Sequence, residues 1–142
     1  MIFNQEDVVM SIEQSLEVTS GFMFLILGLS FLLRPKEWVD WFEGVRIGGL
    51  RMALALGMMH LFFGALFVAL HQVWSGWGMV LTVIGLWAMA EGTLYLLFPA
   101  CIGKMIGWLW PCRNTVIRVS ALITIILAAA LIYPYCSERF SL

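Results

Sequence analysis

Five chemically active side chains interrupt long apolar stretches of this sequence: Arg51, His60, Glu91, Tyr95 and Arg118. A charged group in apolar surroundings is costly, so it must be paired, neutralised or hydrated. These positions are therefore where binding or proton chemistry would take place.

Glu91 lies near the C-terminal end of one apolar stretch, and Arg118 lies near the N-terminal end of the next, so their opposite charges belong to the same side of the two stretches. Arg51 lies at the start of its own stretch, as Arg118 does. We expect a structural ion pair between Glu91 and Arg118, with Tyr95 donating a hydrogen bond to Glu91 from one helical turn away. The alternative is that Glu91 binds a proton or cation, as in small four-helix multidrug exporters. The lack of other polar residues in its stretch argues against a conducting route.

His60 and His71 belong to one apolar stretch and lie about 16 Å apart along a helix. Bridging haem ligands must come from different helices at the same depth, so we expect no haem. A neutral, buried histidine that is hydrogen-bonded across helices is the expectation.

The three cysteines, Cys101, Cys112 and Cys136, form no CxxC pair and have no neighbouring histidine, so no metal site is expected. A disulfide is not expected if Cys101 and Cys112 face the cytoplasm. The sequence has no Ser-His-Asp set, phosphate-binding loop or paired carboxylates. It therefore predicts neither an enzyme nor a cofactor.

The elements that hold these residues are predicted by hydropathy. Hydrophobic residues make up 62% of the 142 residues and charged residues 12%, which indicates that the chain is embedded in a lipid bilayer. We expect a single all-α domain over residues 1–142. Apolar stretches at about 18–33, 52–70, 76–98 and 116–135 predict four transmembrane helices. The first is short, and we expect it to extend backwards to a cap at Asn4. The net charge of −1 argues against a nucleic-acid partner.

The basic residues predict an orientation. Seven of the eight lie in the two longer connections or at the span ends beside them, and the exception is Arg139. By the positive-inside rule these connections are cytoplasmic and both termini are periplasmic. Each connection begins at a proline, Pro35 or Pro99, and has an apolar face that predicts a helix lying on the membrane surface. Four tryptophans would anchor these loops: Trp38, Trp41, Trp108 and Trp110.

The spacing of Gly28 and Pro35 recurs in Gly92 and Pro99, and a basic residue follows each proline into the next span (Arg51, then Arg118). These matches predict two parallel-repeat hairpins, at about 18–71 and 76–136, related by an axis along the membrane normal. The second loop would be three residues longer. Alternatively, any two hairpins with a proline turn would look similar.

The run from Glu91 to Pro99, EGTLYLLFP, resembles the signature of the YjeT-like family, which are small two-helix bacterial inner-membrane proteins of unassigned function. The second half of the chain follows that plan over about residues 78–135. The first half departs from it, with Leu27 in place of the glutamate and Arg34 in place of the aromatic residue before proline. The resemblance implies an accessory protein of the bacterial inner membrane and no catalytic residue.

Small residues recur every seven positions and would form smooth stripes on the helices. In lipid such stripes permit close helix packing, either within the chain or against a partner. They exceed the obvious needs of four helices, so we expect at least one to remain for a neighbour. The stripe residues are Gly21, Gly28, Gly57, Gly64, Gly78, Gly85, Gly92, Ala121 and Ala128.

The leading functional hypothesis is a non-enzymatic accessory or scaffold protein. It would act through helix and loop contacts with lipids and with a membrane-protein partner or further copies of itself. The first alternative is a small oligomeric transporter or pore that uses Glu91 and His60. The second is a protein that handles lipids or quinones, which the aromatic and methionine content favours.

Overall fold

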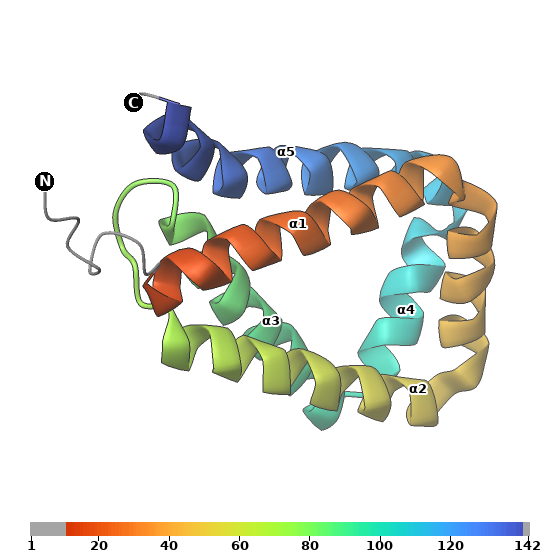
Figure 1. The fold of residues 1–142 in the computed structure, drawn as a ribbon. Coiled ribbons are helices and arrows are strands. Elements are labelled where there is room, and N and C mark those ends of the chain that lie inside the picture. Colours follow the sequence, from red (N-terminus) through yellow and green to blue (C-terminus); the bar gives the residue numbers. More distant parts are fainter. Residues whose placement is uncertain (1–10, 141–142) are drawn as a thin grey trace, which may run out of the picture.

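The computed structural model describes residues 11–140, and only the helical path of the last four of these. This range is helical throughout apart from short connections: α1 (Ile12–Leu33), α2 (Pro35–Leu70), α3 (Met79–Leu97), α4 (Ala100–Leu109), a 3₁₀ turn η2 (Trp110–Cys112) and α5 (Arg113–Phe140) (Figure 1). The all-α prediction is confirmed for these residues. Four helical segments are long and apolar enough to cross a membrane. The cap expected at Asn4 lies outside the described residues.

Helix ends follow local sequence signals. Ser11 caps α1, because its hydroxyl accepts from the backbone N–H of Gln14 while the Gln14 side chain accepts from the backbone N–H of Ser11. The residues before the two prolines adopt nearly the same backbone conformation, with φ −130° and ψ 53° at Arg34 and φ −130° and ψ 67° at Phe98. A proline disfavours helical geometry in the residue before it, so α1 and α3 end in the same way.

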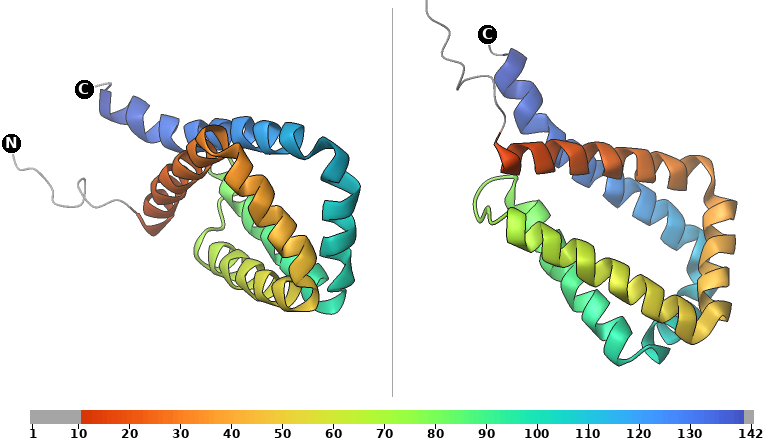
Figure 2. Two further views of the ribbon diagram at one scale, coloured as in Figure 1. Left: turned by 90° about the vertical axis from the view of Figure 1, so that its right-hand side faces the viewer. Right: turned by 60° about the horizontal axis from the view of Figure 1, so that its bottom comes forward.

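Gly49 divides α2 into two differently directed parts, 35–48 and 50–70. Its φ of 54° and ψ of −132° interrupt the helix and belong to a region that favours glycine. The first part forms one edge of the molecule and the second returns as a long apolar helix (Figures 1 and 2). The equivalent change of direction between α4 and α5 uses η2 and its Pro111.

The long helices form two pairs: α1 packs along α5, and residues 50–70 of α2 pack along α3. The two pairs approach each other where α1 begins and α2 ends, which we call the terminal end. They diverge toward the opposite α4 end, where α4 and residues 35–48 of α2 connect them (Figures 1 and 2). Each long helix thus packs mainly against one from the other half of the chain.

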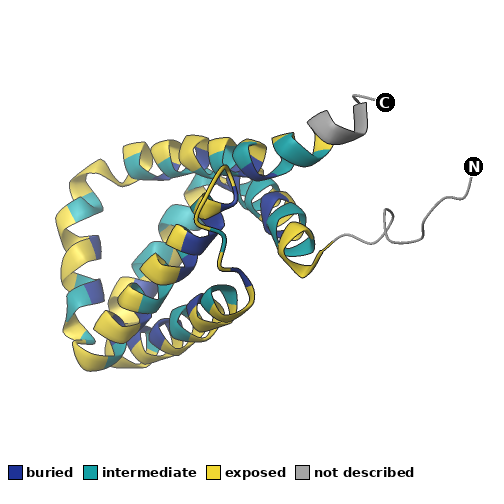
Figure 3. Ribbon diagram, turned by 90° about the vertical axis from the view of Figure 1, so that its left-hand side faces the viewer, coloured by how far each residue is buried: buried dark blue, intermediate teal, exposed yellow. Residues whose placement is uncertain are grey.

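Small residues form the seam of each pair. In the α2–α3 pair, Gly64 faces the backbone of Gly85 and Met89, and Gly57 faces Gly92. In the α1–α5 pair, Gly28 faces Ala121, which is fully buried. The buried positions accordingly lie on the facing sides of the helices (Figure 3).

The expectation that one stripe remains for a neighbour is wrong. The stripe residues of α1, α2, α3 and α5 are all buried, and the contacts of their glycines lie within the two pairs. Gly78 lies on neither seam. It precedes α3 at the terminal end, where the carboxylate of Glu17 leaves no space for a Cβ atom.

We predict that Gly64→Ala destabilises the protein. A Cβ at Gly64 would lie 2.5 Å from the backbone nitrogen of Met89 and 2.8 Å from the Gly85 carbonyl, so the helices must separate. Overpacking of this kind costs about 1–3 kcal/mol. The control is Gly107→Ala on α4, where a Cβ meets nothing within 4 Å and helix propensity favours alanine by about 0.5–1 kcal/mol. Unfolding in detergent measures both, and equal effects would contradict close packing at the seam.

Candidate functional site

The divergence of the helix pairs leaves a cleft of about 520 Å³ toward the α4 end. Its lining comes from α1, both parts of α2, α3 and α4. Apolar and aromatic side chains dominate, and the lining includes neither lysine nor arginine. The lining residues are Leu27, Phe31, Trp38, Trp41, Phe42, Val45, Leu56, Met59, His60, Glu91, Tyr95, Ile102, Met105 and Ile106.

Glu91, Tyr95 and His60 meet on one side of this cleft. The Tyr95 hydroxyl donates to Glu91 Oε1 over 2.8 Å, as the helical spacing predicts. Glu91 Oε2 lies 3.9 Å from His60 Nε2, which is too far for a hydrogen bond. The side chains of His60 and Glu91 are 31% and 28% exposed. The cleft therefore contains a carboxylate and an imidazole that face each other without direct contact.

The contact of Nδ1, the other ring nitrogen of His60, determines which nitrogen of the neutral ring carries the hydrogen. His60 Nδ1 lies 2.9 Å from the Leu56 carbonyl oxygen, which can only accept, so Nδ1 carries a hydrogen. In the neutral ring, Nε2 is then an acceptor directed toward Glu91. The expected hydrogen bond across helices is wrong for His60, because its partner lies one turn back on the same helix.

The predicted ion pair between Glu91 and Arg118 is also wrong. Arg118 is exposed on α5, and its helix packs along α1 rather than along α3. Among the described residues, no lysine or arginine side chain lies within 4 Å of Glu91. Arg51 is likewise exposed, at the start of the second part of α2.

A second polar cluster closes the terminal end and was not predicted. His71 follows α2 and is fully buried, and the predicted hydrogen bonding of a buried histidine across helices is confirmed for it. Its Nε2 lies 2.9 Å from Glu17 Oε1 on α1, and its Nδ1 lies 2.9 Å from Thr82 Oγ1 on α3. Thr82 also lies 2.9 Å from the Val73 carbonyl, to which its hydroxyl can donate. We call Glu17, His71 and Thr82 the clasp, since it ties the two helix pairs together.

A proton must lie between Glu17 and His71 in this geometry. If the Thr82 hydroxyl donates to the Val73 carbonyl, then Nδ1 of His71 donates to the Thr82 oxygen. The 2.9 Å contact between Nε2 and Glu17 then needs a hydrogen of its own, either on Nε2 or on the Glu17 carboxyl. If Thr82 donates to Nδ1 instead, Nε2 carries the ring hydrogen. The sequence held one signal of this contact: Glu17 and His71 both lie at span ends that face the same predicted side.

The tryptophans predicted as anchors have different surroundings. Trp38 and Trp41 line the cleft, and Trp38 Nε1 donates to Ser30 over 3.0 Å, which fixes the first part of α2 against α1. Trp108 is 81% exposed. Trp110 stacks with the guanidinium groups of Arg46 and Arg113, 5.4 Å and 5.2 Å from its ring centre.

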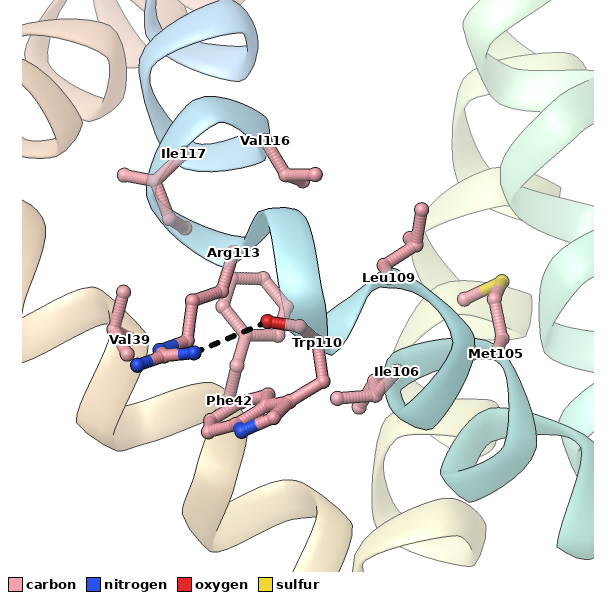
Figure 4. Close-up of a pocket in the computed structure, with 9 residues that line it drawn as sticks. All are labelled: Val39, Phe42, Met105, Ile106, Leu109, Trp110, Arg113, Val116 and Ile117. Carbon is pink, nitrogen blue, oxygen red and sulfur yellow. Dashed lines mark hydrogen bonds between the residues drawn. The ribbon is translucent and has the colours of Figure 1, made fainter.

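Trp110 and Arg113 also border a second, smaller cavity of about 90 Å³ at the α4 end (Figure 4). Arg113 extends toward the Trp110 carbonyl oxygen, to which its Nη1 donates over 3.3 Å. Arg46 pairs with the nearby Glu43, and its hydrogen bond lowers the pKa of the Glu43 carboxyl. Both of these interactions are local, and the two edge segments are linked here by the contact of Arg46 with the Trp110 ring. The cavity is too small for more than a fragment of a ligand.

Comparison with known proteins identifies no relative: no family model, curated protein or solved structure matches the chain. The resemblance of residues 91–99 to the YjeT-like signature stays a prediction. The cleft and the clasp are therefore the features of the molecule that bear on its function.

We predict that the clasp contributes to stability as a unit. Removing Glu17 leaves the fully buried His71 without its carboxylate partner, and removing His71 leaves the 19% exposed side chain of Glu17 without its imidazole partner. A buried polar group left unsatisfied costs about 1–3 kcal/mol. Glu17→Leu and His71→Leu should each lower the free energy of unfolding, and the double variant should lose less than their sum. Glu13→Leu, on the exposed first turn of α1, is the control. Additive losses in chemical unfolding would show that the two residues act independently.

Proposed function

We propose that the protein is a non-enzymatic accessory protein of the bacterial inner membrane that binds a small amphipathic molecule in its cleft. The supporting observation is the convergence of Glu91, His60 and Tyr95 in an otherwise apolar cavity of about 520 Å³. Small-molecule sites typically occupy about 300–1,000 Å³ and combine apolar walls with a few convergent polar groups. These three side chains can hold a polar group.

Membrane insertion is part of this proposal. The four candidate spans carry large apolar side chains on their outer faces, which water would not tolerate but lipid would. The segments at the α4 end carry the basic residues Arg34, Lys36, Arg46, Lys104 and Arg113. The positive-inside rule then places the α4 end in the cytoplasm and the terminal end in the periplasm.

This orientation predicts the outcome of cysteine labelling. In a chain whose native cysteines are replaced by alanine, Ser75→Cys lies in the α2–α3 connection and Lys104→Cys on α4, and both positions are exposed. A membrane-impermeant maleimide added to spheroplasts should label position 75, and position 104 only after the membrane is permeabilised. Labelling in the opposite order would reverse the orientation.

We also propose that the two halves arose by duplication. The seam residues Gly28 and Gly57 lie 64 positions before Gly92 and Ala121, and the contact between Gly28 and Ala121 mirrors that between Gly92 and Gly57. The nearly identical conformations before the two prolines support the same register. Because the separation of 64 positions is the same before and after the loop, the second loop has no additional residues, in contrast to the three that we expected. Arg118 then aligns with Leu54 rather than with Arg51.

The other functional hypotheses are less well supported. A partner helix could not use the seven-residue stripes of α1, α2, α3 and α5, since the two internal seams bury them. Transport by one copy would require a route past the clasp, where His71 is fully buried. A protein that binds a ligand and presents it to a membrane partner needs neither a free small-residue stripe nor a route past the clasp.

Two neighbouring methionines allow a matched test. Both are exposed on the same helix, but Met59 lines the cleft and Met58 does not. We predict that Met59→Trp abolishes the saturable binding of a compact neutral probe, 1-adamantanol, and that Met58→Trp does not. Equilibrium dialysis of the purified protein in detergent, against protein-free micelles, measures this. If the parent chain shows no saturable binding, or both variants bind equally, the cleft is not the site.

A further inference from the structure

We infer that the preferred ligand of the cleft is a lipophilic amine in its ammonium form, held by Glu91 and His60 as two acceptors that share its N–H groups. This inference deepens the proposed function and depends on it, because it names the chemical class that the same cleft would select.

The hydrogen-bond geometry selects a donor. With Nδ1 of His60 committed to the Leu56 carbonyl, the neutral ring presents its Nε2 lone pair to the carboxylate oxygen of Glu91, 3.9 Å away. Hydrogen bonds to nitrogen donors span about 2.7–3.2 Å, so one nitrogen placed to the side of both acceptors can reach each of them. An ammonium group offers three N–H donors, whereas a ketone, ether or carboxylate offers none.

The balance of charge selects a cation. Glu91 is the only acidic residue of the lining, and the lining has no lysine or arginine to offset it. Tyr95 stabilises the carboxylate by one hydrogen bond but brings no positive charge. A ligand ammonium supplies both the charge and the donors. A phospholipid headgroup fits less well, because its phosphate would meet no basic side chain in the cleft.

The walls select an apolar body next to the cationic group. Phe31, Trp38, Trp41 and Phe42 pack edge to face in succession, with ring centres 4.4, 5.7 and 5.0 Å apart. Because the Trp38 N–H is committed to Ser30, its indole contributes apolar and π surface to the lining. Aromatic faces attract ammonium groups most strongly when water is excluded. Together with the volume, this points to a compact hydrophobic amine.

Three probes with one apolar cage and different head groups test this inference: 1-adamantylamine, 1-adamantanol and 1-adamantanecarboxylate. We expect the purified full-length protein in detergent to bind the amine at least about tenfold more tightly than the alcohol, since a hydrogen bond to a charged group contributes more than a neutral one. The carboxylate should show no saturable binding.

The matched variant is Glu91→Gln, which keeps the shape of the side chain and removes its charge. It should remove most of the preference for the amine, measured as the ratio of the affinities for the amine and the alcohol. If Glu91→Gln does not fold, Met59→Trp serves instead, and it should block the amine and the alcohol alike.

The outcomes separate this inference from the proposed function. Equal binding of amine and alcohol, blocked by Met59→Trp, would overturn the ammonium site and leave the cleft as a binding site. Retention of the amine preference in Glu91→Gln would also overturn the inference. If the parent chain binds none of the three probes saturably, both the ammonium site and the proposed binding function are overturned.

Discussion

Close packing along two small-residue seams determines how this molecule is built. At Gly64 and Gly92 the backbones of α2 and α3 approach until a single methyl group has no room, and Gly28 and Ala121 provide a tight seam between α1 and α5. In lipid, where apolar side chains gain nothing by leaving their surroundings, such contact is a main source of helix association. The seams join helices from different halves of the chain, and therefore the two long helices within each half, α1 and α2 or α3 and α5, are held apart.

The cleft follows from this pairing. The first part of α2 and α4 bridge the two pairs at one end, and the clasp draws them together at the other. The space between them stays narrow where Glu17 contacts His71 and widens toward the α4 end. The polar side chains at the two ends have different environments: the clasp is satisfied internally, while Glu91 and His60 face each other across 3.9 Å.

The proposed duplication makes an asymmetry in the cleft visible. With a separation of 64 residues, Glu91 aligns with Leu27 and Tyr95 with Phe31, both of which also line the cleft. His60 aligns with Thr124, which hydrogen-bonds within its own helix to Ser120. The two halves thus share seams and turns but differ at the positions that could hold a polar ligand. In this view the scaffold was retained while one side acquired binding chemistry.

The sequence by itself determined the elements and their ends. Hydropathy predicted four long helices, prolines predicted where two of them stop, and helical spacing predicted the bond between Tyr95 and Glu91. These features depend on residues close in sequence, and so local pattern is sufficient. The local pattern did not predict the break at Gly49 or the precise start of α1, because several residues could end or cap these helices equally well.

Only the tertiary structure decided which helices are neighbours. The sequence favoured Arg118 as the partner of Glu91, since both lie near the same end of successive spans, but α5 packs along α1 and carries Arg118 away. The same pairing brings Glu91 to His60 and places Glu17 beside His71, 54 residues away. Each of the four long helices has small residues at the same seven-residue interval, so their spacing is compatible with several pairings. The choice among these depends on side-chain shape along whole helix faces, which periodicity does not encode.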